Sequence, residues 1–118
     1  MTATISMRLA LTGTNVSLAI APAQKTETPA ADAALSNLQT IGTSAEALVV
    51  GDIGTPGWLA GINTDPTNYV DLSLVSDGST PFAKVLPGQP FLVPCATKVI
   101  YAKANGAPVV LQYLMTSA

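Results

Sequence analysis

The sequence predicts an all-β fold: one β-sandwich or jelly-roll-like domain spanning residues 1–118, built from short antiparallel strands. Three observations support this prediction. Short segments alternate apolar and polar residues, which is the period of a half-buried strand. Turn signals recur about every ten residues, a spacing typical of sandwiches and jelly rolls. Hydrophobic residues make up 48% of the chain, so one chain of this length can bury a core of its own.

The N-terminal region predicts a hairpin followed by an extended, proline-rich arm. Apolar and polar residues alternate over residues 5–11 and again over 15–20, with a glycine between the two runs. Residues 21–34 contain Pro22 and Pro29 among Thr, Glu, Lys and Ala, which predicts an extended loop or arm. Long irregular segments are uncommon in compact domains unless they have a role. Two interpretations remain open, a surface loop and an arm that lies across a neighbouring subunit.

The segment after the arm is ambiguous. Leu35, Leu38 and Ile41 have helical spacing, whereas the Asn, Gln and Thr residues before Gly42 favour a strand over residues 36–41, which is the preferred interpretation. The later strands are expected at residues 45–50, 58–63, 69–74, 82–86, 89–93, 98–104 and 108–115.

The connections between these strands carry recognisable turn chemistry. Asn63 and Asp65 have side chains that can bond to nearby backbone N–H groups. Pro87 and the glycine after it fit a type II turn. Asn105 and the glycine after it predict a hairpin between the last two strands. Strand 89–93 is bounded by prolines, which cannot donate to a ladder, so it is expected at a sheet edge.

Composition excludes several classes of function. The net charge is −2 with no basic cluster, whereas nucleic-acid-binding proteins show a clustered basic footprint. No apolar run approaches the length of about 18 residues that a membrane helix needs. The chain has no histidine, so Ser-His-Asp and Cys-His nucleophiles and the usual zinc ligand sets are missing. We expect no enzyme activity, no cofactor and no metal. Because charged residues are only 10% of the chain against about 25% in typical domains, part of the surface is expected to be covered by other subunits.

The carboxylates could form an acid–base pair or a calcium site, but simpler roles explain the same residues. Asp65, Asp71 and Asp77 can in principle form an acid and base pair, but their spacing places them on separate turns and an outer strand face. Asn63, Asp65 and Asn68 supply the oxygen ligands that calcium prefers. Capping of the turn explains the same residues more simply, so solvated and turn-capping roles are preferred.

The remaining candidates concern contacts. Trp58 and Tyr69 can form a stacking platform for a sugar, although packing is the commoner role of lone aromatic residues. Cys95, the single cysteine, lies among apolar residues and is expected to be a small buried hydrophobe rather than a reactive thiol. The last strand is apolar on both faces, which is compatible with an interface. The residues predicted to contact a partner are Trp58, Tyr69, Val109, Leu111, Tyr113, Pro22 and Pro29.

Four segments of the second half carry a resemblance to a known class of proteins. They are NTDPTNYVDL at residues 63–72, PFAKVLPG at 81–88, IYAKA at 100–104 and VLQYL at 110–114. In this order, the motifs F-x-K-x-x-P-G, Y-A-K-A and L-x-Y-L resemble small structural virion proteins of tailed double-stranded DNA bacteriophages. The first half has no counterpart in this resemblance.

The resemblance implies a β-sandwich virion component, synthesised in the host cytoplasm. The expected function is a capsid decoration or cement protein that oligomerises, with three copies as the favoured number, and bridges capsomers. Its partners would be further copies of itself and the major capsid protein or another virion protein, without direct contact to nucleic acid or membrane. The alternative is a tail, fibre or collar component that acts as a receptor- or sugar-binding β-sandwich module.

Overall fold

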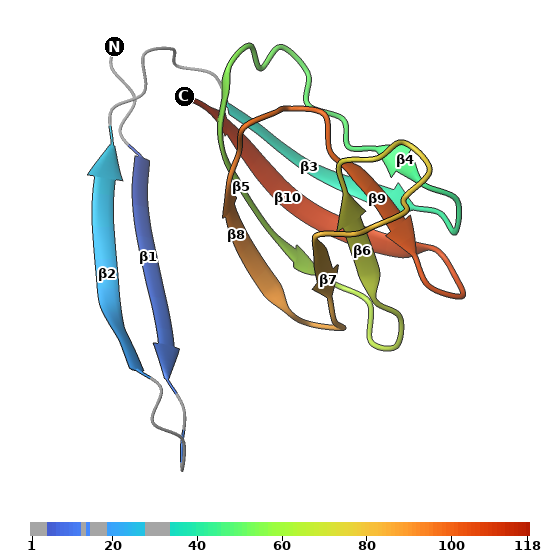
Figure 1. Ribbon diagram of the computed structural model, residues 1–118, viewed down its shortest axis with the longest axis horizontal. Helices are drawn as coiled ribbons and strands as arrows, with labels where there is room; N and C mark the ends of the chain where they lie inside the picture. Colours follow the sequence, from blue (N-terminus) through green and yellow to red (C-terminus); the bar gives the residue numbers. More distant parts are fainter. Residues whose placement is uncertain (1–4, 13, 15–18, 28–33) are drawn as a thin grey trace. The chain divides into compact units, whose positions relative to one another are not determined.

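The computed structural model describes residues 5–12, 14, 19–27 and 34–118 (Figure 1). Every regular element among these residues is a β-strand, so the predicted all-β class is confirmed. No helix in the described part of the chain is long and apolar enough to cross a membrane. The chain divides into two compact units, Met1–Asp32 and Ala33–Ala118.

The first unit contains a two-stranded antiparallel sheet. Strand β1 (Ile5–Thr12) pairs with β2 (Ala19–Glu27) in the order of a hairpin, as predicted, but the second strand begins later and runs further than expected. The stretch predicted as an arm, residues 21–34, is therefore paired strand as far as Glu27; residues 28–33, including Pro29, lie outside the described part.

A bulge explains why this proline-containing stretch can pair. Leu9 pairs with Ala23 and Leu11 with Ile20, so two residues of β2 lie opposite one residue of β1. Pro22 is one of these two residues. A bulge on an edge strand is a position where a proline costs no ladder hydrogen bond.

The second unit is a sandwich of two four-stranded antiparallel sheets (Figure 1). The first sheet has the order β3-β10-β5-β8 and the second has the order β4-β9-β6-β7. The strands of the first sheet are β3 (Ala34–Ile41), β5 (Pro56–Asn63), β8 (Pro90–Pro94) and β10 (Val109–Ser117). Those of the second are β4 (Glu46–Ala47), β6 (Val70–Ser73), β7 (Ala83–Val85) and β9 (Tyr101–Ala104).

Pairing within the sandwich is nested. The first strand of the unit, β3, pairs with the last, β10; β4 pairs with β9, β5 with β8 and β6 with β7. Contacts of β10 with β5 and of β9 with β6 then complete the two sheets. The eight strands thus form one antiparallel ribbon, folded over so that its successive pairs alternate between the sheets.

The core lies between the two sheets and uses the alternating positions of their strands. Strand β10 contributes Val109, Leu111, Tyr113 and Met115, each at most 2% exposed. The other buried apolar residues are Ile41, Leu48, Ile53, Leu59, Val70, Leu72, Val85, Ile100, Ala102 and Ala104.

Two local predictions were wrong. The strand expected over residues 69–74 includes Leu74, but β6 ends at Ser73 and Leu74 is 59% exposed. The hydroxyl of Ser73 explains this end, since it donates to the carbonyl of Ser79 at 2.8 Å and accepts from the N–H of Val75 at 3.0 Å. The chain therefore turns where the alternation predicted further strand.

The expected hairpin at Asn105 also does not form, because β9 and β10 belong to different sheets. Gly106 has the positive φ of +82° that its turn requires, so the turn itself is present. The Asn105 N–H bonds to the carbonyl of Tyr69 at 3.0 Å, which ties the turn to β6. The residues of the turn therefore determine that the chain reverses direction here, whereas long-range contacts determine which strands β9 and β10 pair with.

Other expectations hold. The turn before β8 has a hydrogen bond from Gln89 N–H to Leu86 O at 2.9 Å and a φ of +74° at Gly88, which is type II geometry. Strand β8, with a proline at each end, lies at the edge of its sheet. The segment before Gly42, whose sequence fits both a helix and a strand, forms strand β3, so the preferred prediction of a strand is confirmed.

Candidate functional site

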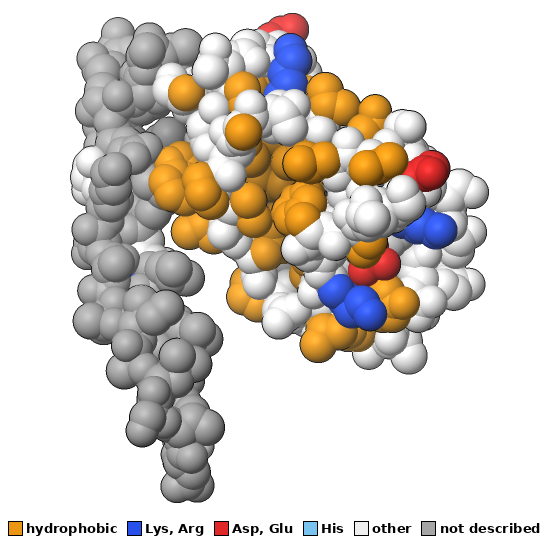
Figure 2. Space-filling view, in the orientation of Figure 1, with side chains coloured by type: hydrophobic (Ala, Val, Ile, Leu, Met, Phe, Trp, Pro, Cys, Tyr) orange, Lys and Arg blue, Asp and Glu red, His pale blue; other side chains and the backbone are white. Residues whose placement is uncertain are grey.

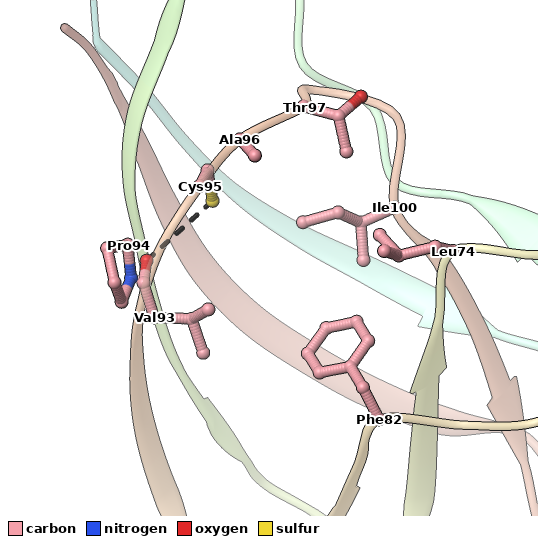
Figure 3. Close-up of a pocket in the computed structure, with 8 residues that line it drawn as sticks. All are labelled: Leu74, Phe82, Val93, Pro94, Cys95, Ala96, Thr97 and Ile100. Atoms are coloured by element: carbon pink, nitrogen blue, oxygen red, sulfur yellow. Dashed lines mark hydrogen bonds between the residues drawn. The ribbon is translucent and has the colours of Figure 1, made fainter.

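An apolar pocket opens where the free edges of the two sheets face each other (Figure 3). Its volume is about 180 Å³. One side is formed by β8 and the residues after it, the other by the ends of β6 and β7 (Figure 3). Its lining consists of Leu74, Phe82, Val93, Pro94, Cys95, Ala96, Thr97 and Ile100.

Large side chains at this pocket remain in contact with solvent. Leu74 is 59% exposed and Phe82 is 46% exposed. Figure 2 shows hydrophobic side chains gathered over this side of the sandwich. Apolar surface that is concave and accessible is a recurrent property of binding sites. The pocket therefore offers a place for an apolar side chain or a small apolar molecule.

The only thiol of the chain lines this pocket but is not activated. The Cys95 S–H donates to the carbonyl of Val93 at 3.7 Å. Burial raises the pKa of the Cys95 thiol above its usual value. The nucleophilic form of cysteine is the thiolate, so a raised pKa keeps Cys95 unreactive near neutral pH. This fits the small hydrophobic role expected from the sequence.

The two aromatic residues proposed as a sugar platform lie on different sheets. Trp58 is at the start of β5, where its backbone N–H donates to Thr116 Oγ1 at 3.2 Å. Tyr69 directly precedes β6 in the second sheet, and the Lys84 ammonium lies 4.3 Å from the centre of its ring. That cation occupies one face of the ring. The structure does not bring Trp58 and Tyr69 together into one stacking surface.

In the turn considered for calcium, two of the candidate ligand oxygens accept hydrogen bonds from the turn's own backbone. Asp65 Oδ2 accepts the N–H groups of Thr67 at 2.9 Å and Asn68 at 2.6 Å. These bonds, led by the one from Asn68, lower the pKa of Asp65 below its usual value. Asn63 Oδ1 accepts the N–H of Asp65 at 2.8 Å. The side chains cap the turn, as preferred from the sequence.

Three of the predicted contact residues are in the core and present no surface to a partner. Val109 and Leu111 are 0% exposed and Tyr113 is 2% exposed. The Tyr113 hydroxyl lies 2.9 Å from Gln39 Oε1 and also contacts the carbonyl of Val49, so it holds the chain after β4 against the first sheet. The last strand is apolar on both faces for different reasons: one face fills the core, and the other is open.

Of the other predicted contact residues, Pro22 lies in the bulge of β2 and Pro29 lies outside the described residues. Trp58 and Tyr69 are half-buried. The predicted contact residues do not include the open face of the last strand, where Val110 and Leu114 are each 40% exposed. Alternation could have separated the two faces, but it could not tell which one faces the core.

A second, polar hollow of about 200 Å³ lies on the second sheet. Its lining consists of Tyr69, Asp71, Gly78, Lys103, Ala104 and Asn105. Among the described residues, Asp71 Oδ1 is a buried side-chain oxygen without a hydrogen-bond partner. Because an unsatisfied buried acceptor is costly, a ligand that donates a hydrogen bond here would be favoured.

No metal site emerges from the described part of the chain, where no three His, Cys, Asp or Glu side chains cluster. The described residues offer three kinds of surface: an apolar pocket, a polar hollow and exposed apolar strand faces. Comparison of the chain with protein-family models, with curated proteins and with solved structures gave no match.

Proposed function

We propose that the chain is a non-enzymatic structural protein of the virion of a tailed double-stranded DNA bacteriophage, and specifically a decoration or cement protein. It would act on the capsid surface as a homo-oligomer that contacts the major capsid protein and bridges neighbouring capsomers. The proposal starts from the four segments that resemble such virion proteins. Its capsomer-bridging mechanism needs surface contact and no catalytic group.

One observation carries this proposal beyond the resemblance: large apolar side chains stay exposed on several sides of a chain that is poor in charge. They are Leu38, Val49, Ile62, Leu74, Val75, Phe82, Leu86, Val99, Val110 and Leu114, each at least 36% exposed. Each 100 Å² of apolar surface removed from water contributes about 2.5 kcal/mol before the costs of association. Covering this surface would stabilise an assembly without any chemical step.

The nested strand pairing also supports the proposal. We infer a jelly roll from it, since an antiparallel ribbon of eight strands folded into two sheets is the arrangement that this name describes. Jelly rolls occur in viral capsid proteins and in lectins. The fold alone therefore fits both candidate functions, and the choice between them depends on the surface.

The test uses capsids whose major capsid protein is encoded beside the gene for this chain. We expect the purified chain to co-sediment with capsids that lack it, at a fixed ratio, and to raise the temperature at which they release DNA. Leu86→Asp and Val99→Asp would each place a charge on exposed apolar surface, and at least one should weaken binding. Failure of the wild-type chain to bind such capsids would exclude the decoration role.

The polar hollow favours a second candidate, a sugar-binding module of a tail, fibre or collar. Asp71 offers a buried acceptor without a partner, Lys103 and Asn105 offer donors, and Tyr69 offers an aromatic ring beside them. Sugar hydroxyls can supply the donor that Asp71 Oδ1 lacks. This site replaces the one expected from the sequence, because it contains Tyr69 but neither Trp58 nor Asp65.

A glycan array followed by calorimetry with the best sugar tests this candidate. Asp71→Asn should abolish binding, whereas Asp52→Asn, at an exposed position that does not line the hollow, should leave it unchanged. Because Asp71 Oδ1 has no partner in the free chain, Asp71→Asn should also fold as stably as the wild type. An array without hits, or equal binding by both variants, would rule the sugar site out.

A further inference from the structure

The two outer faces of the sandwich differ sharply in charge. None of the four strands of the first sheet contains Lys, Arg, Asp or Glu. Each of the four strands of the second sheet contains one charged residue, namely Glu46, Asp71, Lys84 or Lys103. Register places Asp71 between Lys84 and Lys103 on neighbouring strands. The charged side chains of the second sheet thus favour contact with solvent, whereas the outer face of the first sheet is neutral.

This neutral face also exposes large apolar side chains. Leu38 is 64% exposed, Val110 and Leu114 are each 40% exposed and Ile62 is 36% exposed. Register aligns Leu38, Gln112 and Ile62 in one row across β3, β10 and β5. The next row contains Ser36, Leu114 and Ala60. We define the neutral face by these seven residues of the first sheet, namely Ser36, Leu38, Ala60, Ile62, Val110, Gln112 and Leu114.

The neutral face has both a projection and a recess. Leu38 on the edge strand β3 is its most exposed side chain. Beside it, a hollow of about 240 Å³ opens over β10 and β5, where the small side chain of Ala60 leaves room. A projecting leucine and a recess on the same face are self-complementary: two copies related by a two-fold axis can each insert Leu38 into the hollow of the other.

The size of the face is sufficient for such a contact. The strands of the first sheet, β3, β5, β8 and β10, have eight, eight, five and nine residues. At about 3.3 Å per residue and about 4.8 Å between strands, they cover about 480 Å². Two such faces in contact remove about 1,000 Å², which is the lower bound for a specific interface. Its neutrality favours a like face, because stacking two copies brings no equal charges together and leaves no charge unpaired.

We propose that the neutral face binds the neutral face of a second copy of this chain, giving a two-fold symmetric pair of sandwiches. This deepens the homo-oligomer part of the proposed function and assigns its surface. The contact uses the exposed residues of β10 rather than Val109, Leu111 and Tyr113, which fill the core. A symmetric contact of this kind closes at two copies, whereas three copies need a head-to-tail contact.

Sedimentation equilibrium of the full chain tests the proposal. The wild type should be a dimer with a dissociation constant that is micromolar or tighter. Leu38→Asp would place a charge in the recess of the partner and should weaken dimerisation at least about 100-fold. Leu74→Asp is the matched control, because Leu74 is 59% exposed but lines the pocket of Figure 3, so this variant should remain a dimer.

Both variants should keep the circular dichroism spectrum of the wild type, since both side chains are exposed. Leu74→Asp should also keep its unfolding midpoint, whereas Leu38→Asp should lose the stabilisation that dimerisation contributes. A second measurement locates the contact: with Cys95→Ser, the pair Leu38→Cys and Ala60→Cys should give disulfide-linked dimers on mild oxidation. Leu74→Cys with Cys95→Ser should give none.

Several outcomes would overturn the pairing: a monomeric or trimeric wild type, a dimeric Leu38→Asp variant, or loss of dimers in Leu74→Asp alone. The pairing and the virion role fail separately. Capsid binding by a monomeric chain would refute only the pairing, whereas a stable dimer that does not bind capsids would refute only the decoration role.

Discussion

Replacing Asn63, the buried last residue of β5, by alanine should strongly destabilise the sandwich. Asn63 ends β5, is 0% exposed and connects three parts of the second unit. Its Nδ2 donates to the carbonyl of Asn68 at 2.9 Å and to that of Val85 at 3.0 Å. Its Oδ1 accepts the N–H of Asp65 at 2.8 Å. The amide thus joins β5, the following turn and β7.

The magnitude follows from these three bonds. Each contributes about 1 kcal/mol net, and buried partners left unpaired add to the loss, so Asn63→Ala should lower the free energy of unfolding by about 3 kcal/mol. For a unit of this size, such a loss corresponds to a decrease in Tm of about 12–24 °C. Asn63→Asp keeps the volume but turns an acceptor towards two carbonyl oxygens, so it should destabilise at least as much.

Urea unfolding, followed by the fluorescence of Trp58 and by circular dichroism, measures both losses. The slope of the free energy of unfolding against urea concentration should stay the same in both variants, because the surface exposed on unfolding does not change. Asn105→Ala, an exposed asparagine in another turn, is the control and should change stability by less than about 0.5 kcal/mol. If Asn63→Ala lost less than about 1 kcal/mol, or if Asn63→Asp were neutral, the hydrogen-bond explanation would be refuted.

Four further predictions concern stability and reactivity. Gly61→Ala should cost about 1–3 kcal/mol in thermal unfolding, because its Cβ would lie 2.5 Å from an aromatic ring atom and 2.6 Å from a backbone oxygen; no loss would mean that β5 shifts freely. Tyr113→Phe should cost about 1–2 kcal/mol by removing the buried hydroxyl, and an equal stability would show that water replaces it. Hydrogen bonds lower the pKa of both Asp65 and Asp77 below the reference value of 3.8, so their stabilising contribution is present above that pH and is lost as the pH falls through the lowered values. Urea midpoints between pH 5 and pH 2 should therefore fall more steeply in the wild type than in the variant carrying Asp65→Asn and Asp77→Asn. Alkylation of Cys95 by iodoacetamide at pH 7.5 should be slower than that of a free thiol, and rapid reaction would contradict the raised pKa.

Local signals in the sequence predicted the elements of the sandwich well. Alternation located the strands, proline placed β8 at an edge, and Pro87 with its following glycine gave the type II turn. These features depend on a few neighbouring residues, so the sequence carries them directly. The capping role of Asp65 was predictable for the same reason, since its acceptor and donors lie within three residues.

The failures all involve partners that are distant in the chain. The turn at Asn105 has hairpin chemistry, yet its two strands pair with other strands. Val109 and Val110 are chemically identical neighbours, and only the position of the second sheet decides that the first is 0% and the second 40% exposed. Pro22 favours an irregular arm in the sequence, but in the structure a bulge of β2 accommodates it. Such outcomes follow from tertiary packing, which periodicity cannot encode.

The nested pairing has a consequence for how the second unit is made. Ile41 pairs with Val109 and Ala34 with Thr116, so the first strand finds its partner only when the last has been synthesised. Strand β10 lies between β3 and β5; β5 also pairs with β8, but β3 has no other neighbour in the first sheet. Ribosome-bound intermediates would therefore carry an unpaired, uncharged strand, and folding dominated by such distant contacts takes on the order of milliseconds to seconds. During that interval, the lack of charge on this strand is a risk of aggregation, which binding to a chaperone would limit.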